Sequence, residues 1–515
     1  MAKKHQTLHN ALFNTASWVF SIGINFVFLP YIVAMLGTEA YGIFVLILAV
    51  IGYFAMLELN LGQAMTKYVA EYHAKGDLSQ VNDIIGSTML LYLLLGLAGG
   101  GIIFGLADVL ARGFLKVPPE LQDTAVAAFK VGSVGFVLTM LVTAMQSIPW
   151  GLNRYDVSSR VTMAMNLLTT MAMVGLLVMG FGLLEVVLVN VAVPLLGVLT
   201  YVVVCRGLLP GIRLRPVFRP GPLRTILHFG LYSSLSRLSG VLRFQADRIL
   251  TGAILGLSWV TYYVVPFNLV RKLMTVTYLV GSVILPLVSG LQGAQDHKAI
   301  VALYLKASRL IATIALCVCL PLMLFGGRFL GFWMGQEFAG KAGLVTALIT
   351  AALLVDAFTN VPSIVVDGLG RPKITGLFSI ATALINLALV YPLGKLLGVN
   401  GIAVAFLASN LMVGPVFVWY ANNRVLGHDL RSLARRAYLP PLAAGAMAAV
   451  LTWIFLAPLA TSLLTLLAVM AANSLLFLLS ACLTGAISRE ELAQAAEYAQ
   501  PMLARLRPRF GRQQS

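Results

Sequence analysis

The chain has 515 residues, of which 59% are hydrophobic and only 11% are charged, and its mean hydropathy is +0.90. A soluble globule of this length needs far more polar surface, so the composition excludes a soluble protein and indicates a chain embedded in lipid. The formal net charge is +17, yet no basic patch with interleaved aromatic residues indicates nucleic-acid binding.

Apolar runs long enough to cross a bilayer follow one another from Leu8 to Ile487. A spanning helix needs about 20 such residues, so we predict an all-α integral membrane protein with about 14 transmembrane helices. The predicted segments are residues 10–36, 40–62, 84–110, 123–150, 160–182, 183–206, 225–254, 258–290, 300–326, 342–367, 374–394, 397–422, 437–457 and 462–487.

Lysine and arginine are concentrated in alternate connections between these segments. The longest polar stretches, 63–83, 207–224 and 488–515, all fall on this basic side, and so does the N-terminus. The opposite side carries only Arg112, Lys116, Arg328, Lys341 and Lys395. By the positive-inside rule, we predict a multi-pass protein of the inner (plasma) membrane with both termini in the cytoplasm.

Short sequence patterns recur in order at nearly one offset. Gly37 and Gly256 are 219 residues apart, as are Asp77 and Asp296, whereas Gly151 and Gly368 are 217 apart and Gly182 and Gly398 are 216 apart. This recurrence predicts a duplicated six-helix unit whose two copies run parallel across the membrane, with a substrate site between the halves near mid-membrane. We predict an N-lobe (1–222), a C-lobe (223–430), two added helices (431–487) and a basic cytoplasmic tail (488–515).

Several motifs resemble those of the polysaccharide-type flippases, which move O-antigen and capsule repeat units. The similar stretches are residues 29–44 (LPYIVAMLGTEAYGIF), 59–62 (LNLG), 67–71 (KYVAE), Asp247-Arg248 ahead of Gly256 and Tyr262-Tyr263, and Leu285-Pro286. The resemblance extends over residues 10–425. It places the chain in the superfamily that also holds lipid II flippases and multidrug exporters. It implies two six-helix lobes around a central cavity and export of an undecaprenyl-pyrophosphate-linked oligosaccharide.

Five cations lie inside the seventh and eighth predicted helices: Arg237, Arg243, Arg248, Arg271 and Lys272. A cation at the centre of a membrane helix costs about 2.5–3.5 kcal/mol, so such residues are expected to face water, a partner or a substrate. Guanidinium groups bind phosphate oxygens in a bidentate manner, so a cationic cavity suits a pyrophosphate. We interpret Arg237, Arg243 and Arg271 as substrate-binding and Lys272 as a further candidate, whereas Arg248 fits snorkelling to the outer interface better.

Polar and acidic residues supply further candidates. Asn14 and Asn25 share one face of the first helix and could meet sugar hydroxyls, although hydrogen bonds between helices are the commoner use of such residues in lipid. Asp356 and Asn360 are one turn apart on a helix that contains Pro362, an oxygen set suited to a coupling proton or sodium ion. A carboxylate hydrogen-bonded to a neighbouring helix is an equally good interpretation of Asp356. Asp247 is a further ion-coupling candidate and lies one turn from Arg243.

The sequence contains no motif of nucleotide hydrolysis, zinc proteolysis or serine hydrolysis. Its four cysteines, Cys205, Cys317, Cys319 and Cys482, form no CxxC pair, and its six histidines lie at helix ends. We therefore predict no catalytic residues, no cofactor and no metal site.

The resulting hypothesis is a monomeric flippase that works by alternating access on a polyprenyl-pyrophosphate-linked glycan. Membrane lipid surrounds it, and polysaccharide polymerases and glycosyltransferases are candidate protein partners. Lipid II flipping and multidrug export are alternatives within the superfamily, but export of cationic drugs calls for an anionic cavity. A membrane oligosaccharide polymerase or ligase is the alternative of another class, and the short outer loops disfavour it. A passive scaffold would not need buried arginines.

Overall fold

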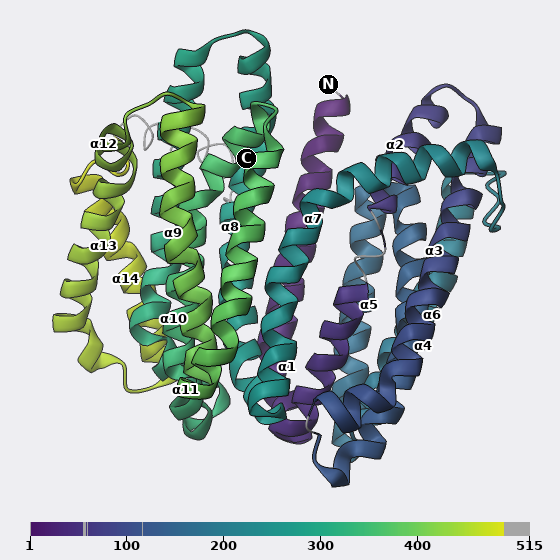
Figure 1. Ribbon diagram of the computed structural model, residues 1–515, viewed down its shortest axis with the longest axis horizontal. Helices are drawn as coiled ribbons and strands as arrows, with labels where there is room; N and C mark the ends of the chain where they lie inside the picture. Colours follow the sequence, from purple (N-terminus) through teal and green to yellow (C-terminus); the bar gives the residue numbers. More distant parts are fainter. Residues whose placement is uncertain (1, 55–57, 59, 116, 489–515) are drawn as a thin grey trace, which may run out of the picture. The chain divides into compact units, whose positions relative to one another are not determined.

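The computed structural model describes residues 2–54, 58, 60–115 and 117–488. For residues 2–19, 21, 22, 25, 229–245, 279 and 282 it describes the backbone alone. Within these ranges there are fourteen α-helices and no strand (Figure 1). The helices are α1 (Ala2–Phe54), α2 (Leu61–Ala74), α3 (Leu78–Asp108), α4 (Pro119–Gly151), α5 (Tyr155–Val178), α6 (Leu183–Leu208), α7 (Pro220–Leu255), α8 (Leu257–Gly293), α9 (His297–Met334), α10 (Gln336–Gly368), α11 (Pro372–Tyr420), α12 (Leu430–Leu433), α13 (Leu439–Leu451) and α14 (Leu463–Leu483).

The predicted all-α membrane fold is confirmed. Each predicted segment falls on helical backbone over most of its length, and 11 helices in the described part of the chain are long and apolar enough to cross a membrane. α1 and α11 each hold two predicted segments. Kinks interrupt these two helices at Gly37 (φ 77°, ψ 160°) and Gly398 (φ 62°, ψ −141°), where the left-handed backbone favours glycine. Gly37 lies between its two predicted segments, whereas Gly398 lies at the start of the predicted segment 397–422.

The helices divide into two compact units. Unit 1 comprises Met1–Val265 and Ser379–Ala405, and unit 2 comprises Pro266–Phe378 and Phe406–Ser515. α8 and α11 therefore contribute residues to both units. The lobes at 1–222 and 223–430, with the added helices at 431–487, stay a prediction, because compact units need not coincide with repeats. The predicted tail falls outside the described residues from position 489 onward.

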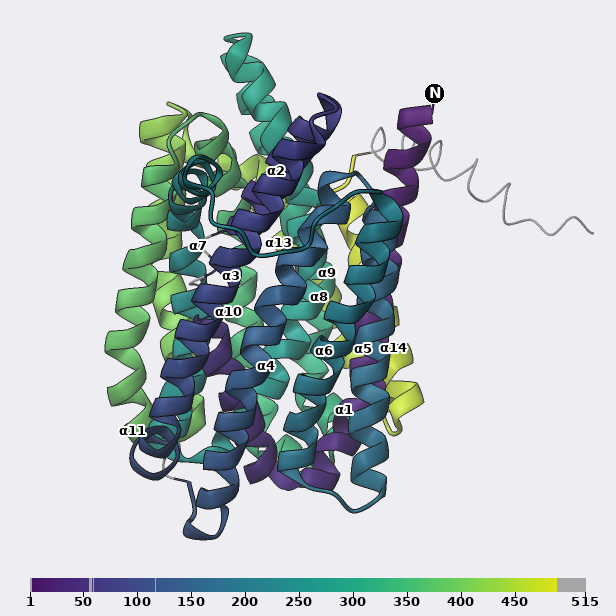
Figure 2. The same cartoon turned by 90° about the vertical axis from the view of Figure 1, so that its right-hand side faces the viewer.

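In unit 1, α3, α4, α5 and α6 run side by side (Figures 1 and 2). Small residues let their backbones approach closely. A Cβ added to Gly135 of α4 would lie 2.7 Å from the Asn190 carbonyl oxygen of α6, and one added to Gly100 of α3 would lie 3.1 Å from the Ser133 carbonyl oxygen of α4. Close packing of this kind replaces the hydrophobic effect as the source of helix association in lipid.

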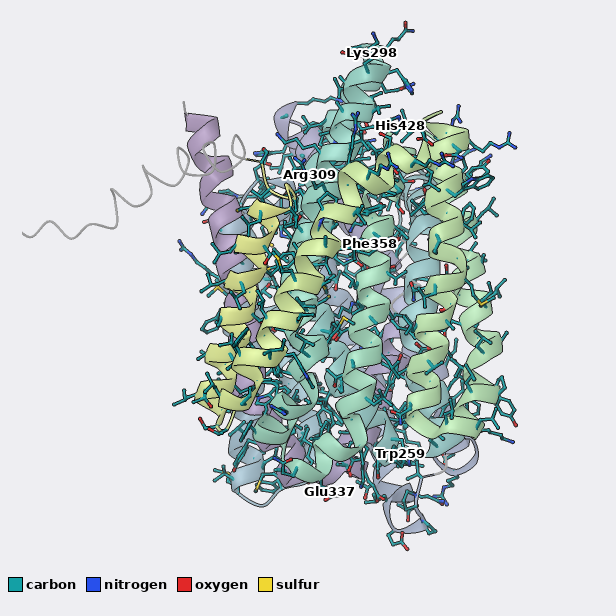
Figure 3. The ribbon with its side chains drawn as sticks, turned by 90° about the vertical axis from the view of Figure 1, so that its left-hand side faces the viewer. Trp259, Lys298, Arg309, Glu337, Phe358 and His428 are labelled. Carbon is teal, nitrogen blue, oxygen red and sulfur yellow. The ribbon has the colours of Figure 1, made fainter. Side chains whose placement is uncertain are left out.

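Unit 2 is built around the pair α9 and α10, on which α13 and α14 pack. One core joins Tyr304 and Ile311 of α9 to Val361 and Val365 of α10. A second core joins Leu316 of α9 to residues of α13 and α14. In Figure 3, Lys298 and His428 lie at one end of this unit and Glu337 lies at the opposite end.

Two turns have nearly the same backbone in both halves of the sequence. Asp77 begins α3 and accepts a hydrogen bond from the Gln80 amide at 3.0 Å; Asp296 begins α9 and accepts one from the Ala299 amide at the same distance. The residues before these aspartates are left-handed, with φ of 73° at Gly76 and 56° at Gln295. Helix capping by aspartate thus recurs 219 residues later.

The turn before α5 recurs before α11. The Arg154 amide donates to the Pro149 carbonyl at 2.8 Å, and the Arg371 amide donates to the Val366 carbonyl at 3.1 Å. The residue before each arginine is left-handed. Gly37 and Gly256 likewise both have positive φ, whereas Gly182 (φ −113°) and Gly398 (φ 62°) differ. Three of the four recurring patterns therefore share a local backbone conformation, which supports the predicted duplication.

Candidate functional site

Unit 1 contains a buried carboxylate that is held by three helices. Asp247 of α7 is only 1% exposed. Its Oδ2 accepts a hydrogen bond from the Tyr263 hydroxyl of α8 at 2.8 Å, and its Oδ1 accepts one from the Asn386 amide nitrogen of α11 at 2.7 Å. Hydrogen bonds of this kind make burial of a carboxyl group tolerable in an apolar interior.

The Asn386 side chain also presents an acceptor beside this carboxylate. Its Oδ1 is buried and accepts no hydrogen bond from the described residues. The predicted ion-coupling residue Asp247 thus lies in a small buried group of polar side chains. The predicted pair with Arg243 falls outside the description, because only the backbone of Arg243 is described.

Unit 2 contains a second polar group, formed by α8 and α10. The Tyr278 hydroxyl of α8 donates to Asp356 Oδ2 of α10 at 2.7 Å. Arg271, two helical turns before Tyr278, is within electrostatic reach of both the tyrosine and the carboxylate. The structure therefore brings together a predicted substrate-binding residue and a predicted ion-coupling residue.

Asn360 extends this group along α10. It is 8% exposed and lies one turn from Asp356. A Cβ added to Gly281 of α8 would lie 3.0 Å from Asn360 Oδ1 and 2.7 Å from the Ile364 side chain. Glycine at position 281 thus lets α8 approach α10 at the asparagine, which fixes the spacing of the two helices beside Asp356.

The other predicted site residues are described less fully. Lys272 follows Arg271 on α8 and is half-buried. Arg237 of α7, and Asn14 and Asn25 of α1, have a described helical backbone, but their side chains lie outside the description. Their roles in substrate binding stay predictions.

Three partners were not predicted from the sequence: Tyr263, Tyr278 and Asn386. Tyr278 carries a weak signal, since its seven-residue separation from Arg271 places both on one face of a helix. Asn386 carries another, because it interrupts an otherwise apolar predicted segment and such residues commonly form hydrogen bonds between helices in lipid. Neither signal says which acid is contacted.

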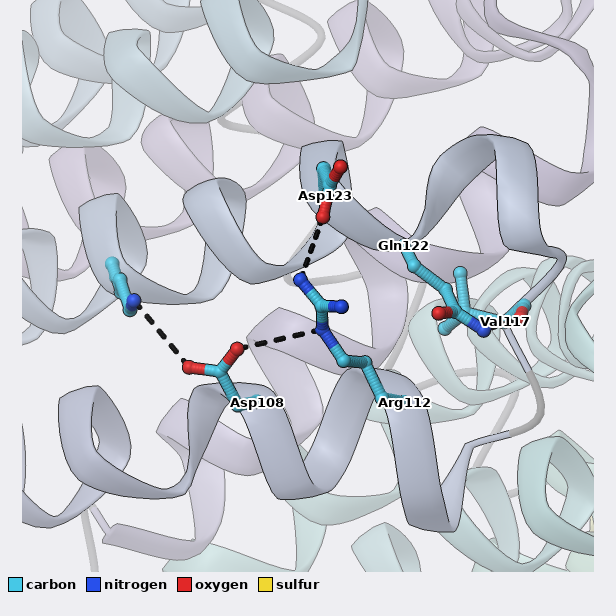
Figure 4. A network of polar contacts seen from close by, with 6 residues as sticks. Asp108, Arg112, Val117, Gln122 and Asp123 are labelled. Atoms are coloured by element: carbon cyan, nitrogen blue, oxygen red, sulfur yellow. Dashed lines mark hydrogen bonds and ion pairs between the residues drawn. The ribbon is translucent and has the colours of Figure 1, made fainter.

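A charged network lies where α3 ends and α4 begins, and it is distinct from both polar groups (Figure 4). Arg112 Nη2 lies 2.7 Å from Asp123 Oδ1 and Arg112 Nε lies 3.5 Å from Asp108 Oδ1, while Lys130 Nζ lies 3.4 Å from Asp108 Oδ2. These side chains are largely exposed. Exposed pairs stabilise a protein only slightly, so the network links the helix ends without forming a site.

Metal ligands do not gather within the described ranges: no group of three or more histidine, cysteine, aspartate or glutamate side chains could hold an ion there.

The sequence model of the family described as "Polysaccharide biosynthesis protein" matches residues 7–292, which is more than half of the chain. The chain belongs to this family.

Two relatives align with most of this polysaccharide biosynthesis protein. The "Uncharacterized membrane protein EpsK" of Bacillus subtilis (strain 168) is 24% identical over 450 residues, covering 84% of this chain and 86% of EpsK. The "Putative O-antigen transporter" of Shigella flexneri is 20% identical over 419 residues, covering 80% of this chain and 97% of that protein.

Solved structures with a similar fold include transporters and a flippase. A multidrug resistance MATE family transporter of the MOP superfamily, in an inward-facing conformation, has a TM-score of 0.69 with 16% identity, covering 80% of this chain and 94% of the other. The lipid II flippase MurJ, in an inward closed conformation, has a TM-score of 0.68 with 11% identity, covering 96% of this chain and all of MurJ.

These comparisons confirm the predicted family and fold of this polysaccharide biosynthesis protein. The names of its relatives and structural neighbours are those of transporters and a flippase rather than of catalysts, in agreement with the prediction that it is not an enzyme. It is a multi-pass membrane protein, and both relatives come from bacteria.

Proposed function

We propose that this chain is a flippase that moves a polyprenyl-pyrophosphate-linked oligosaccharide from the cytoplasmic to the outer leaflet. The observation that carries this proposal is Arg271, a cation within an apolar spanning helix of a polysaccharide biosynthesis protein. A cation at that position carries a large insertion cost, which a transported phosphate group would offset. The similarity to transporter and flippase folds gives independent support.

The proposed substrate site consists of Arg237, Arg243 and Arg271 for the pyrophosphate, with Lys272 as a fourth cation. Asn14 and Asn25 are proposed to contact the sugars. Transport proceeds by alternating access of the lobes at 1–222 and 223–430, and the polyprenyl tail stays in lipid. The chain acts as a monomer with both termini in the cytoplasm, and polymerases and glycosyltransferases are the proposed protein partners.

Ion coupling is proposed to use the two polar groups described above. Asp356 and Asn360 in unit 2, and Asp247 in unit 1, offer carboxylate and amide oxygens inside apolar helices. Tyr278 donates a hydrogen bond to the Asp356 carboxylate, and Arg271 is within electrostatic reach of it. A substrate phosphate that draws Arg271 away would leave Asp356 to Tyr278 and to an entering cation or proton, which would link substrate binding to ion binding.

A leaflet-accessibility assay tests the proposed function. The purified chain is reconstituted into liposomes with a fluorescent polyprenyl-pyrophosphate-linked oligosaccharide, and a membrane-impermeant quencher reports the fraction in the outer leaflet. Loss of a charge-assisted hydrogen bond costs about 1.5–3 kcal/mol, so Arg243→Ala and Arg271→Ala should each slow flipping about ten- to hundredfold. Arg271→Lys keeps the charge but loses the bidentate geometry, so it should be intermediate.

Arg309→Ala is the matched control. Arg309, like Arg271, is a cation in a spanning helix of unit 2, but it is half-buried and lies on α9 toward the end that carries Lys298 (Figure 3). Its removal should leave flipping unchanged. Unchanged flipping in both Arg243→Ala and Arg271→Ala, with normal membrane insertion, would remove the proposed site.

The MATE-like fold leaves drug export as the alternative that the same liposomes can test. A cationic dye should not be moved by the wild-type chain, because positive side chains repel cations. Transport of lipid II at a rate equal to that of the oligosaccharide substrate would instead favour lipid II flipping. Growth of the glycan chain during the assay would favour a polymerase.

A further inference from the structure

The coil that joins α6 to α7 is fixed to the first turns of α3. We call residues 209–219 the arginine coil. The Asn82 side chain of α3 contacts its backbone twice: Nδ2 donates to the Gly211 carbonyl at 3.2 Å, and Oδ1 accepts from the Arg213 amide at 2.8 Å. Farther along, the Val217 amide donates to the Gly86 carbonyl at 3.1 Å. A coil held at three points has a defined path.

Gly86 shows that the coil lies directly against the helix. A Cβ at this buried position would lie 2.9 Å from the Arg215 carbonyl oxygen and 3.2 Å from the Val217 Cβ. Only glycine allows this approach without a shift of the coil backbone. The sequence of α3 is thus adapted to receive the coil.

The side chains of the coil alternate between the protein and its surroundings. Ile212 is buried and Leu214 is half-buried, whereas Arg213 and Arg215 are exposed. Within the part of the chain that the structure describes, neither of these two guanidinium groups lies in an ion pair. Fixing the backbone therefore presents two cations outward from one edge of unit 1.

The end of the coil combines charge with an exposed aromatic ring. Arg219 Nε lies 3.5 Å from Asp83 Oδ1, so one arginine is directed back to α3. Beside it, Phe218 is 65% exposed. Arginine beside an exposed aromatic side chain is the composition that favours the boundary between headgroups and acyl chains.

The length of the neighbouring span places the coil at headgroup level. The candidate span that begins at Leu78 has 37 residues. As a helix it is about 55 Å long, whereas the hydrocarbon layer is about 30 Å thick. If the excess is shared between the two ends, the first turns, which carry Asn82 and Gly86, extend beyond the hydrocarbon. Figure 2 shows the coil crossing this end of unit 1.

We propose that the arginine coil is a docking site for the headgroups of anionic phospholipids. Topology alone requires only that positive charge lie on this side of the membrane. It does not require a backbone held by an asparagine side chain and a close glycine contact. Outward arginines bind phosphate oxygens, and Phe218 enters the adjacent acyl layer.

Lipid binding to the full chain in detergent provides the test. A fluorescent phosphatidylglycerol is titrated against the purified protein, and phosphatidylcholine of the same chain length measures binding without a net headgroup charge. Each arginine near an anionic lipid surface contributes about fivefold in affinity. Arg213→Gln combined with Arg215→Gln should thus weaken phosphatidylglycerol binding about 25-fold and leave phosphatidylcholine binding unchanged.

Two further variants distinguish the effect of the fixed coil backbone from the effect of net positive charge. Arg371→Gln combined with Arg424→Gln removes the same charge from exposed positions of unit 2, and it should leave phosphatidylglycerol binding unchanged. Asn82→Ala keeps every arginine but removes both side-chain contacts to the coil, and it should weaken binding at least fivefold. Thermal unfolding of each variant verifies that the fold is retained.

Several outcomes would overturn the proposal. Equal losses in the two double variants would mean that net charge alone attracts lipid. Unchanged binding after loss of Arg213 and Arg215 would remove the coil as a site. Displacement of phosphatidylglycerol by millimolar inorganic phosphate would indicate a free-anion site. Displacement by far less polyprenyl pyrophosphate would instead assign the coil to capture of the carrier lipid.

Discussion

A glutamine occupies a left-handed backbone position in the turn before α9. Its φ is 56°, and the residue at the matching place before α3 is Gly76, with φ of 73°. A side chain in this region is strained by about 1–2 kcal/mol, whereas glycine loses about 0.5–1 kcal/mol of backbone entropy instead. The two turns thus have the same left-handed backbone conformation, but glutamine adopts it at a higher free-energy cost than glycine.

Gln295→Gly should therefore raise the free energy of unfolding by about 0.5–1 kcal/mol. Gly76→Gln at the twin position should lower it by a similar amount. The thermal unfolding midpoint of the detergent-purified chain measures both. A loss of stability in Gln295→Gly would mean that the glutamine side chain makes a contact worth more than the strain.

The buried group around Asp247 gives a second prediction at the same scale. Tyr263→Phe and Asn386→Ala each remove one donor to the carboxyl group, and each should lower stability by about 1.5–3 kcal/mol. In an Asp247→Ala background the same changes should cost much less, because the acceptor is gone. Unfolding midpoints of the single and double variants form the cycle, and strict additivity would show that these contacts do not stabilise the protein.

At the scale of elements, glycine determines how closely helices can approach. A Cβ added to Gly42 of α1 would lie 2.3 Å from the backbone oxygen of Leu257 in α8, which cannot move aside like a flexible side chain. Gly42→Ala should destabilise unit 1 by about 1–3 kcal/mol. Gly105→Ala in α3 is the matched control, since nothing lies within 4 Å of its Cβ. An equal effect of the two changes on the unfolding midpoint would contradict this reading.

Helices were predictable from the sequence because the bilayer requires long apolar runs whose backbone groups bond within the segment. The breaks near Gly37 and Gly398 were predictable because the apolar runs are interrupted there. The side-chain partners were not predictable. Asp356 and Asn360 stood out as polar residues in lipid, but Tyr278 reads equally well as an interfacial aromatic residue, and only the packing of α8 on α10 pairs it with the acid. Asn82 gave no signal, since its partners are backbone atoms about 130 residues away along the chain.

At the scale of the whole molecule, the asymmetry of basic residues predicts the orientation in the membrane. Lys298 and Glu337 lie at opposite ends of unit 2 (Figure 3), and the positive-inside rule assigns the Lys298 end to the cytoplasm. In a background without the four native cysteines, an impermeant maleimide should label Glu337→Cys in intact cells. It should label Lys298→Cys only after the membrane is opened. The reverse pattern would invert the assigned topology.

Two continuous helices belong to both compact units, and this continuity limits how the molecule can deform. α8 passes from unit 1 to unit 2 between Val265 and Pro266, and α11 passes between them twice. Each passage lies within continuous helical backbone rather than in a loop, so hydrogen bonds between successive turns hold it. Pro266 has no amide hydrogen to give to the Tyr262 carbonyl, so α8 lacks one such hydrogen bond where it changes unit.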